Sequence, residues 1–511
     1  MQHEDWLNEL KERGREIYLL EHTAALLGWD QETCLPEKAV EERSEQLALL
    51  EGLAHEKLAH PRVTELLEKL GATLETPKGT VPLTDVDAGY VRHFFRRHRR
   101  EVCFPEDLVR EFARRTSIAQ SVWARARKSN DFALFAPELK KIVALIKERA
   151  RLLKVGTHPY DALIDTYEPG MTKAELDRIF IPLKKELTAL VAQIKTRPQP
   201  QTDFFNAEYP LEDQRKLGNL ILARLGYPQD RGRLDVSAHP FTTTLGADDV
   251  RITTRYGEPN PFNSFFSTVH EAGHGLYELG FGDAVRGNLL ADGTSLGIHE
   301  SQSRSWENLI ARSRPFWHGF YGEVQKLFPG ILGEVPEETF YQAINRVSPS
   351  FIRVDADEVT YSLHVILRYE LETALMEGTL EVEDLPRVWD DKMEQFLGIR
   401  PDKLSLGVLQ DVHWSAGLFG YFPTYALGNL YGAQLFRAAR RDLPGLMDDV
   451  EAGRFAPFLD WLRRSIHQYG STYTAGELLQ SITGEPLNPG YFTSYLKEKY
   501  QDIYGGESFG G

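Results

Sequence analysis

Residues 260–280 read NPFNSFFSTVHEAGHGLYELG and form the most informative stretch of the chain. Asn260 followed by Pro261 is typical of a helix start, because asparagine caps free backbone N–H groups and proline suits the first helical position. Apolar residues then recur at intervals of three and four, which predicts a helix with one buried face. His270 and His274 fall in the middle of this predicted helix, one turn apart.

The segment His270-Glu271-Ala272-Gly273-His274 has the spacing H-E-x-x-H. Residues four apart lie one above the other on a helix, so both imidazole rings can reach one metal ion. Glu271 projects beside them, where a general base would act on a water molecule. The alternative interpretation is a pair of core histidines that are hydrogen-bonded to neighbouring polar groups.

A third ligand is needed, because catalytic zinc keeps three protein ligands and one open position. The best candidate is Glu300, which a second helix can bring back after the Gly- and Asp-rich segment 280–297. Glu300 could instead form a salt bridge with Arg304, one helical turn later. His299 is the weaker candidate, because adjacent residues on a helix point roughly 100° apart.

Helical periodicity dominates the rest of the chain, with an exception just before the histidine helix. Phe241 to Leu245 and Val250 to Tyr256 are β-rich runs separated by residues 246–249, which predicts a β-hairpin. One edge of this hairpin could pair with an extended peptide backbone and lay it across the metal ion. The alternative is a hairpin with a purely structural role.

Composition and charge restrict the class of protein. The formal net charge of −16 over 511 residues argues against a nucleic-acid partner. Two cysteines, Cys34 and Cys103, imply no disulfide framework, and residues 1–15 lack the apolar core of a secretory signal, so we expect a cytoplasmic protein. The uncharged run 414–436 is rich in glycine and polar residues, which predicts the buried wall of a cavity and no membrane crossing.

Six short motifs occur in order along the chain: HPF at 239–241, DVRIT at 249–253, HEAGH at 270–274, HESQ at 299–302, IRVDAD at 352–357 and GVLQDVHW at 407–414. In these motifs, and over essentially its whole length, the chain resembles the carboxypeptidase Taq metallocarboxypeptidases, the M32 family. The resemblance implies that His270, His274 and Glu300 bind one divalent metal ion per chain. It also implies that Glu271 is the general base. Zn²⁺ suits such ligands best, and Co²⁺ also fits them.

The same resemblance implies a fold and an assembly. We expect a mainly α fold, with a large helical body of two lobes around a deep cleft and a small β-hairpin next to the active-site helix. The chain would form a single catalytic domain, 1–511, with lobes of approximately 1–230 and 231–511. A homodimer is also implied, as is broad specificity for peptide substrates with reluctance to cleave near proline.

Two further residues are assigned by analogy with the His and Tyr pair of related helical zinc oligopeptidases. A hydrolysed peptide bond develops an oxyanion that needs positioned hydrogen-bond donors. His413 and Tyr425, which lie around the uncharged run, are the candidates. Each could instead be a buried polar residue that bonds to the backbone.

An exopeptidase also needs a cation for the terminal carboxylate of its substrate, ideally an arginine, whose planar fork matches a carboxylate. Arg353 is the favoured candidate, because it lies between Ile352 and Val354 in an apolar strip where an arginine needs a specific partner. That partner could instead be an aspartate, Asp355 or Asp357, in a structural ion pair. The motif residues expected near the substrate without a defined role are His239, Arg251 and Gln410.

Together these features predict a metal-dependent carboxypeptidase that releases single C-terminal residues. An endopeptidase or a dipeptidyl carboxypeptidase on the same scaffold is an alternative. An aminopeptidase would need an acidic cluster for the substrate amine, for which no motif is present. An inactive peptide-binding protein would require a lost ligand or base, whereas all four of the central residues are present.

Overall fold

The computed structural model describes residues 2–257, 260–506 and 508–509 of the 511. The chain forms two compact units, and each is built from three separate segments. The first unit comprises Met1–Val102, Thr202–Ile344 and Leu435–Gly484, and the second comprises Cys103–Gln201, Asn345–Gln434 and Glu485–Gly511. These units differ from the continuous halves 1–230 and 231–511 that we expected, because helices from distant parts of the chain pack together within each unit.

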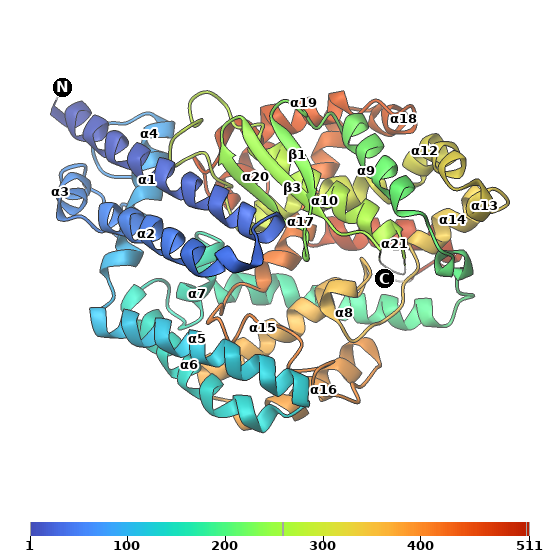
Figure 1. The fold of residues 1–511 in the computed structure, drawn as a ribbon, viewed down its shortest axis with the longest axis horizontal. Helices are drawn as coiled ribbons and strands as arrows, with labels where there is room; N and C mark the ends of the chain where they lie inside the picture. Colours follow the sequence, from blue (N-terminus) through green and yellow to red (C-terminus); the bar gives the residue numbers. More distant parts are fainter. Residues whose placement is uncertain (1, 258–259, 507, 510–511) are drawn as a thin grey trace. The chain divides into compact units, whose positions relative to one another are not determined.

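Helices make up most of the first unit (Figure 1). They are α1 (Gln2–Thr33), α2 (Val40–Leu58), α3 (Pro61–Lys69), α4 (Asp85–Val102), α9 (Leu211–Leu225), α10 (Phe262–Glu278), α11 (Leu296–Arg304), α12 (Arg314–Leu327), α13 (Pro329–Leu332), α14 (Glu337–Ile344), α18 (Leu446–Glu451), α19 (Ala456–Ser465) and α20 (Ala475–Thr483). A π-helical turn, Ser305–Ala311, continues directly from α11.

The second unit is also helical. Its helices are α5 (Glu106–Ser129), α6 (Phe132–Leu153), α7 (Asp161–Tyr167), α8 (Lys173–Lys195), α15 (Tyr361–Glu377), α16 (Leu385–Leu397), α21 (Gly490–Tyr504) and the first part of α17 (Pro423–Asp442). Among the described residues, no helix combines the length and the apolar character that a membrane span requires. The expectation of a mainly α protein is confirmed.

A small sheet in the first unit lies against α10. Its strands are β1 (Gly232–Val236), β2 (Thr242–Gly246) and β3 (Asp249–Thr254), in the order β1-β3-β2. The antiparallel pair β2 and β3 confirms the predicted hairpin. β1 pairs with β3 in parallel and was not expected from the sequence. Val250 and Ile252 on β3 are fully buried, so the central strand anchors the sheet to the core.

Aromatic packing fixes the start of α10. The Oδ1 atom of Asn260 accepts a hydrogen bond of 3.0 Å from the backbone N–H of Phe262, as the sequence predicted for a helix start. The Phe262 ring lies 4.8 Å from that of Phe340, and the Phe265 ring lies 5.7 Å from that of Trp317. These buried rings hold the helix that carries both histidines.

Two glycines let α10 approach its neighbours closely. A Cβ atom at Gly273 would lie 2.7 Å from the Cα atom of Ser303 and 2.8 Å from the carbonyl oxygen of Gln302, both on α11. A Cβ atom at Gly275 would lie 3.3 Å from the Cγ2 atom of Ile252 on β3. The absence of a side chain at Gly273 therefore lets the backbone of α11 come close enough to bring Glu300 to the histidines.

Gly273→Ala should push α11 away from α10, because the added methyl group meets backbone atoms that cannot rotate aside. We expect a loss of about 1–3 kcal/mol of stability from overpacking, together with weaker binding of a divalent metal ion, for which Zn²⁺ serves as the probe. Thermal unfolding and chelator competition measure the two effects. Gly322→Ala is the control: its Cβ atom would meet nothing within 4 Å on α12, so it should stabilise the protein by about 0.5–1 kcal/mol. Unchanged Zn²⁺ affinity in Gly273→Ala would contradict this account.

Candidate active site

Three potential metal ligands of the first unit converge on one point. His270 and His274 lie on α10 and Glu300 lies on α11, and their ligand atoms are all within 4.8 Å of one another. The Oε2 atom of Glu300 is 3.5 Å from the Nε2 atom of each histidine. Tetrahedral ligands about 2.1 Å from a zinc ion are separated by roughly 3.4 Å, so the spacing suits such an ion.

The two oxygens of Glu300 have different partners. Oε2 faces the histidines and accepts a hydrogen bond of 3.1 Å from the Ser303 hydroxyl. Oε1 accepts a hydrogen bond of 2.7 Å from Nε of Arg304. Burial acts to raise the pKa of Glu300, but Arg304 and the histidines outweigh it and hold that pKa well below its usual value. The salt bridge weighed as an alternative is therefore present together with the ligand cluster.

Glu307, on the π-helical turn after α11, holds the far side of His270. Its Oε2 atom lies 2.9 Å from Nδ1 of His270 and accepts a hydrogen bond of 3.1 Å from Arg304. Burial would raise the pKa of Glu307, but Arg304 and the other partners lower it to about 2. A carboxylate at Nδ1 places the ring proton there, which leaves the lone pair of Nε2 directed toward Glu300.

Glu271 is buried beside the cluster and contacts the edge strand of the sheet. The Thr242 hydroxyl on β2 lies 2.7 Å from Oε2 of Glu271 and 3.0 Å from its backbone carbonyl oxygen. Burial raises the pKa of Glu271, although the hydrogen bond from Thr242 opposes the shift. A carboxylate with a raised pKa is suited to accepting a proton near neutral pH.

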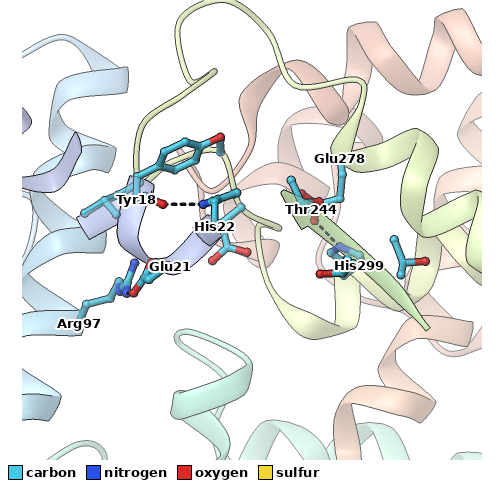
Figure 2. A pocket seen from close by; sticks show the side chains of 12 residues that line it. Tyr18, Glu21, His22, Arg97, Thr244, Glu278 and His299 are labelled. Atoms are coloured by element: carbon cyan, nitrogen blue, oxygen red, sulfur yellow. Dashed lines mark hydrogen bonds and ion pairs between the residues drawn. The ribbon is translucent and has the colours of Figure 1, made fainter. Parts of the chain in front are cut away.

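His299 packs against His274 at the wall of a cavity of about 380 Å³. The Nδ1 atoms of the two histidines are 2.6 Å apart, and Nε2 of His299 lies 2.6 Å from Oε1 of Glu278. Figure 2 shows Glu278 and His299 pointing toward each other on the side of the cavity next to β2. Thr242 also lines this cavity, which therefore adjoins the Glu271 site. Burial and the neighbouring His299 lower the pKa of His274 to about 3.

Arg353 lies in the second unit, in a buried cluster of charges. Its guanidinium lies 3.2 Å from Asp411, and it donates a hydrogen bond of 3.3 Å to the Tyr361 hydroxyl. Arg368 donates two hydrogen bonds, of 2.5 and 2.7 Å, to the other oxygen of Asp411. The ion-pair partner of Arg353 is thus Asp411, whereas Asp357 accepts backbone N–H groups just before α15. Two guanidinium groups share one carboxylate, so a positive charge remains on this cluster.

Three other predicted residues join the same cluster. The side-chain oxygen of Gln410 accepts a hydrogen bond of 2.9 Å from the backbone N–H of Arg353. The guanidinium of Arg353 lies 4.7 Å from the centre of the Tyr425 ring, and the rings of His413 and Tyr425 are 6.4 Å apart. Burial lowers the pKa of His413 to about 4, so its imidazole is neutral near pH 7.

The remaining two predicted residues lie in the first unit, around the sheet. His239 is exposed in the connection between β1 and β2. Arg251 on β3 pairs with Asp249 at 2.8 Å and stacks on Trp29 with 4.3 Å to the ring centre. Their expected role near the substrate stays a prediction.

Sequence reasoning missed Glu307 and Thr242, which contact the predicted residues directly, and Glu278, which contacts His299. Glu307 follows Glu300 by seven residues and Glu278 follows His274 by four, and these helical spacings could have identified them. Thr242 carried no comparable signal. Thr242 reaches Glu271 only through the register of a hairpin edge, and Glu278 reaches His274 only through a histidine on another helix.

The chain is similar to known proteins over nearly its whole length. The sequence profile of the carboxypeptidase Taq (M32) metallopeptidases matches residues 9–500. Thermostable carboxypeptidase 1 of Thermus thermophilus is 44% identical over 506 residues, which cover 97% of this chain and 98% of that protein. Carboxypeptidase 1 of Bacillus subtilis is 39% identical over 485 residues, covering 94% of this chain and 95% of that protein.

Solved structures give the same result. The crystal structure of the M32 carboxypeptidase from Deinococcus radiodurans R1 has a TM-score of 0.94 at 38% identity, covering 98% of this chain and all of that one. A Pyrococcus furiosus carboxypeptidase structure, described as Apo-Mg, has a TM-score of 0.93 at 40% identity, with coverage of 97% and 99%.

Glu372 on α15 should make the stability of the protein depend on pH. It is fully buried and accepts hydrogen bonds from the Tyr160 hydroxyl, the Trp414 indole and the Gly420 backbone N–H, so it fixes the loop that carries His413. Burial raises its pKa from 4.5 to about 7. The folded state therefore favours the protonated acid, and this stabilisation is lost as the pH rises from about 4.5 through 7.

The variant Glu372→Gln removes that titration. Relative to the wild type it should gain stability as the pH rises from 5 to 8, by at most about 3 kcal/mol for a shift of roughly 2.5 pKa units. The midpoint of thermal unfolding, measured at several pH values, tests this. Glu381→Gln, at an exposed glutamate of the same unit, is the control. If the difference in unfolding midpoint between the variant and the wild type did not change with pH, the raised pKa of Glu372 would be contradicted.

Proposed function

Because the chain belongs to the carboxypeptidase Taq (M32) metallopeptidase family, we propose that His270, His274 and Glu300 hold its metal ion and that Glu271 is its general base. The protein is a metal-dependent carboxypeptidase, a hydrolase that acts on peptides. The endopeptidase, aminopeptidase and inactive alternatives are not favoured by these relationships. The observation that carries the assignment of residues is the single oxygen of Glu300 that lies 3.5 Å from both histidines.

The donor set fits a divalent ion of intermediate hardness. Two imidazole nitrogens and one carboxylate oxygen are the ligands of many catalytic zinc sites, and they leave a position open. Cobalt accepts the same ligands, so we propose Zn²⁺ with Co²⁺ as the alternative. When bound, such an ion supplies Lewis-acid activation of water and of the scissile carbonyl group.

Glu271 performs the proton transfers in this proposal. Its carboxylate takes a proton from the attacking water and returns a proton to the leaving amine. Burial supports this role, because the raised pKa brings the carboxyl group closer to the pH at which it must both accept and release a proton. The Thr242 hydroxyl restricts the rotation of the carboxylate by holding one of its oxygens.

His413 and Tyr425 are proposed to stabilise the negative charge that develops on the scissile carbonyl oxygen. A neutral imidazole can still donate one N–H group, and the lowered pKa of His413 keeps it in that form. The Tyr425 hydroxyl would be the second donor. The ring contacts between these two residues and Arg353 support a common role.

Arg353 is proposed to bind the terminal carboxylate of the substrate. It is only 5% exposed, and the cluster with Arg368 and Asp411 keeps a positive charge that a carboxylate would balance. The arginine fork can make two parallel hydrogen bonds to a carboxylate, which would select peptides with a free C-terminus. The separation of this anchor from the metal ion would set the number of residues released, and we propose that it is one.

We also propose a homodimer that works in the cytoplasm. Leucine side chains are exposed on α1 and α2, including Leu19, Leu26, Leu49 and Leu53, and these two helices pack side by side (Figure 1). An exposed apolar patch on two adjacent helices would suit a protein interface. A chain with only two cysteines suits a reducing compartment. Light scattering in solution tests the dimer: twice the mass of one chain would support it, and the mass of one chain would contradict it.

Glu271→Gln should separate metal binding from catalysis. The amide cannot accept the proton, so we expect kcat to fall by about 100-fold or more, with Zn²⁺ affinity close to that of the wild type. Hydrolysis assays and chelator competition measure the two properties. Glu334→Gln, at an exposed glutamate of the same unit, should change neither. Turnover retained in Glu271→Gln would remove the general-base assignment.

Arg353→Ala should weaken the transition state for peptides with a free C-terminal carboxylate. We expect kcat/KM to fall about 30-fold or more, the equivalent of ~2–5 kcal/mol for a buried charge pair. Arg353→Lys keeps the charge without the fork and should recover part of the loss. Arg387→Ala, at an exposed arginine of the same unit, is the control. A lower unfolding temperature with proportionate loss on every substrate would instead indicate a structural ion pair.

A further inference from the structure

We propose that His299 and Glu278 are positioning residues that hold His274 in the tautomer and orientation required for metal binding at its Nε2 atom. The inference rests on the proposed metal site and assigns a role to a histidine that neither the ligand set nor the proton transfers use. The contacts form one line from Glu278 through His299 to His274, with both steps 2.6 Å long.

The direction of the hydrogen bonds in this line follows from its two ends. A carboxylate only accepts hydrogen bonds, so Glu278 receives the Nε2–H group of His299. At the other end, a metal ion held by Nε2 of His274 leaves the proton of that ring on Nδ1, where it is donated to the Nδ1 lone pair of His299. Nε2 of His274 lies 3.5 Å from Oε2 of Glu300, on the side of the proposed metal ion. The opposite tautomer would place a proton where a ligand lone pair is needed.

We call this line of hydrogen bonds, from Glu278 through His299 to His274, the relay. Packing holds the His299 ring in the position that the relay requires. The ring lies 4.5 Å from that of His274 and 5.2 Å from that of Tyr277, measured between centres. A Cβ atom at Gly293 would lie 2.8 Å from Cδ2 of His299, so the glycine leaves room for the ring. These contacts restrict the rotation of His299 and keep its two nitrogens aligned with their partners.

Through the relay, each of the two histidine ligands is linked at its Nδ1 atom to a carboxylate. His270 contacts the carboxylate of Glu307 directly at Nδ1, whereas His274 reaches the carboxylate of Glu278 through one intervening imidazole. Glu278 lies four residues after His274 on α10, and His299 is contributed by α11. Loss of such an outer partner typically costs 10–100-fold in metal affinity, because the ligand ring loses its fixed tautomer and basicity.

Chelator competition with Zn²⁺ on the full chain tests this relay. His299→Phe keeps a ring of similar size without either nitrogen and should lower the Zn²⁺ affinity 10–100-fold. Glu278→Gln retains a carbonyl oxygen that accepts from His299, so its loss should be smaller than that of Glu278→Leu. His22→Phe is the matched control, because His22 lines the same cavity but bonds to the Tyr18 carbonyl oxygen (Figure 2). It should leave the affinity unchanged.

Nitrogen-15 NMR of labelled histidines gives a second measurement that altered packing alone would not change. The wild-type protein should show His274 protonated at Nδ1, with slow exchange of that proton with solvent. In His299→Phe the proton should exchange faster, and Glu278→Gln should resemble the wild type more closely than Glu278→Leu does. If His299→Phe proves unable to fold, the two Glu278 variants still give the comparison.

The outcomes separate the relay from the metal site itself. Zn²⁺ affinity of His299→Phe and Glu278→Leu within about threefold of His22→Phe would overturn the relay. His270→Asn, in the same titration, tests the ligand set: if it also bound Zn²⁺ as the wild type does, the proposed metal site would be wrong. Loss of affinity in His270→Asn but not in the other variants would leave the site standing and remove only the relay.

Discussion

The close approach of α10 and α11 at Gly273 is the constraint on which the candidate metal site depends. A side chain at this position would collide with backbone atoms of Ser303 and Gln302, and the helices would have to separate. At the observed separation of the helices, one oxygen of Glu300 lies equally far from both histidines. The H-E-x-x-H spacing aligns two ligands along one helix, and the glycine within it admits the helix that supplies the third.

Electrostatics then divides the work between two buried glutamates of the first unit. Arg304 and the histidines hold Glu300 ionised despite its burial, so it is ready to act as a ligand. Glu271 is also buried, but no arginine of the described part of the chain is among the groups that act on it, and burial outweighs His270 and the Thr242 hydroxyl, so its pKa is raised. Two carboxyl groups with pKa values shifted in opposite directions are suited to two different roles, one as an ion and one as a base.

Local patterns in the sequence predicted much of this site. The helix around His270 and His274, the return of Glu300 and the β2–β3 hairpin all follow from periodicity, spacing or turn chemistry that lies within short stretches. Arg353 was proposed from its place in an apolar strip, and His413 and Tyr425 from an analogy with helical zinc oligopeptidases. No spacing connects these residues of the second unit to the histidines.

Contacts between distant segments could not be predicted in this way. β1 is a five-residue strand whose parallel partner, β3, lies beyond a loop and another strand. Neither an alternation of apolar and polar residues nor a turn motif therefore predicts the pairing. Asp411 is the ion-pair partner of Arg353 although Asp355 and Asp357 are much closer in sequence. Each unit combines three separate segments, so dividing the chain at one point cannot reproduce the two units. Proximity along the chain says little about which helices pack together.

The most direct test of the account is a mass-spectrometric time course on one peptide of mixed sequence. The peptide is supplied with a free or an amidated C-terminus, and each form is incubated with and without a metal chelator. The account predicts a ladder of products that shortens by single residues from the free C-terminus and disappears on amidation or chelation. Internal fragments, equal cleavage of the amidated peptide, or cleavage that resists the chelator would contradict it.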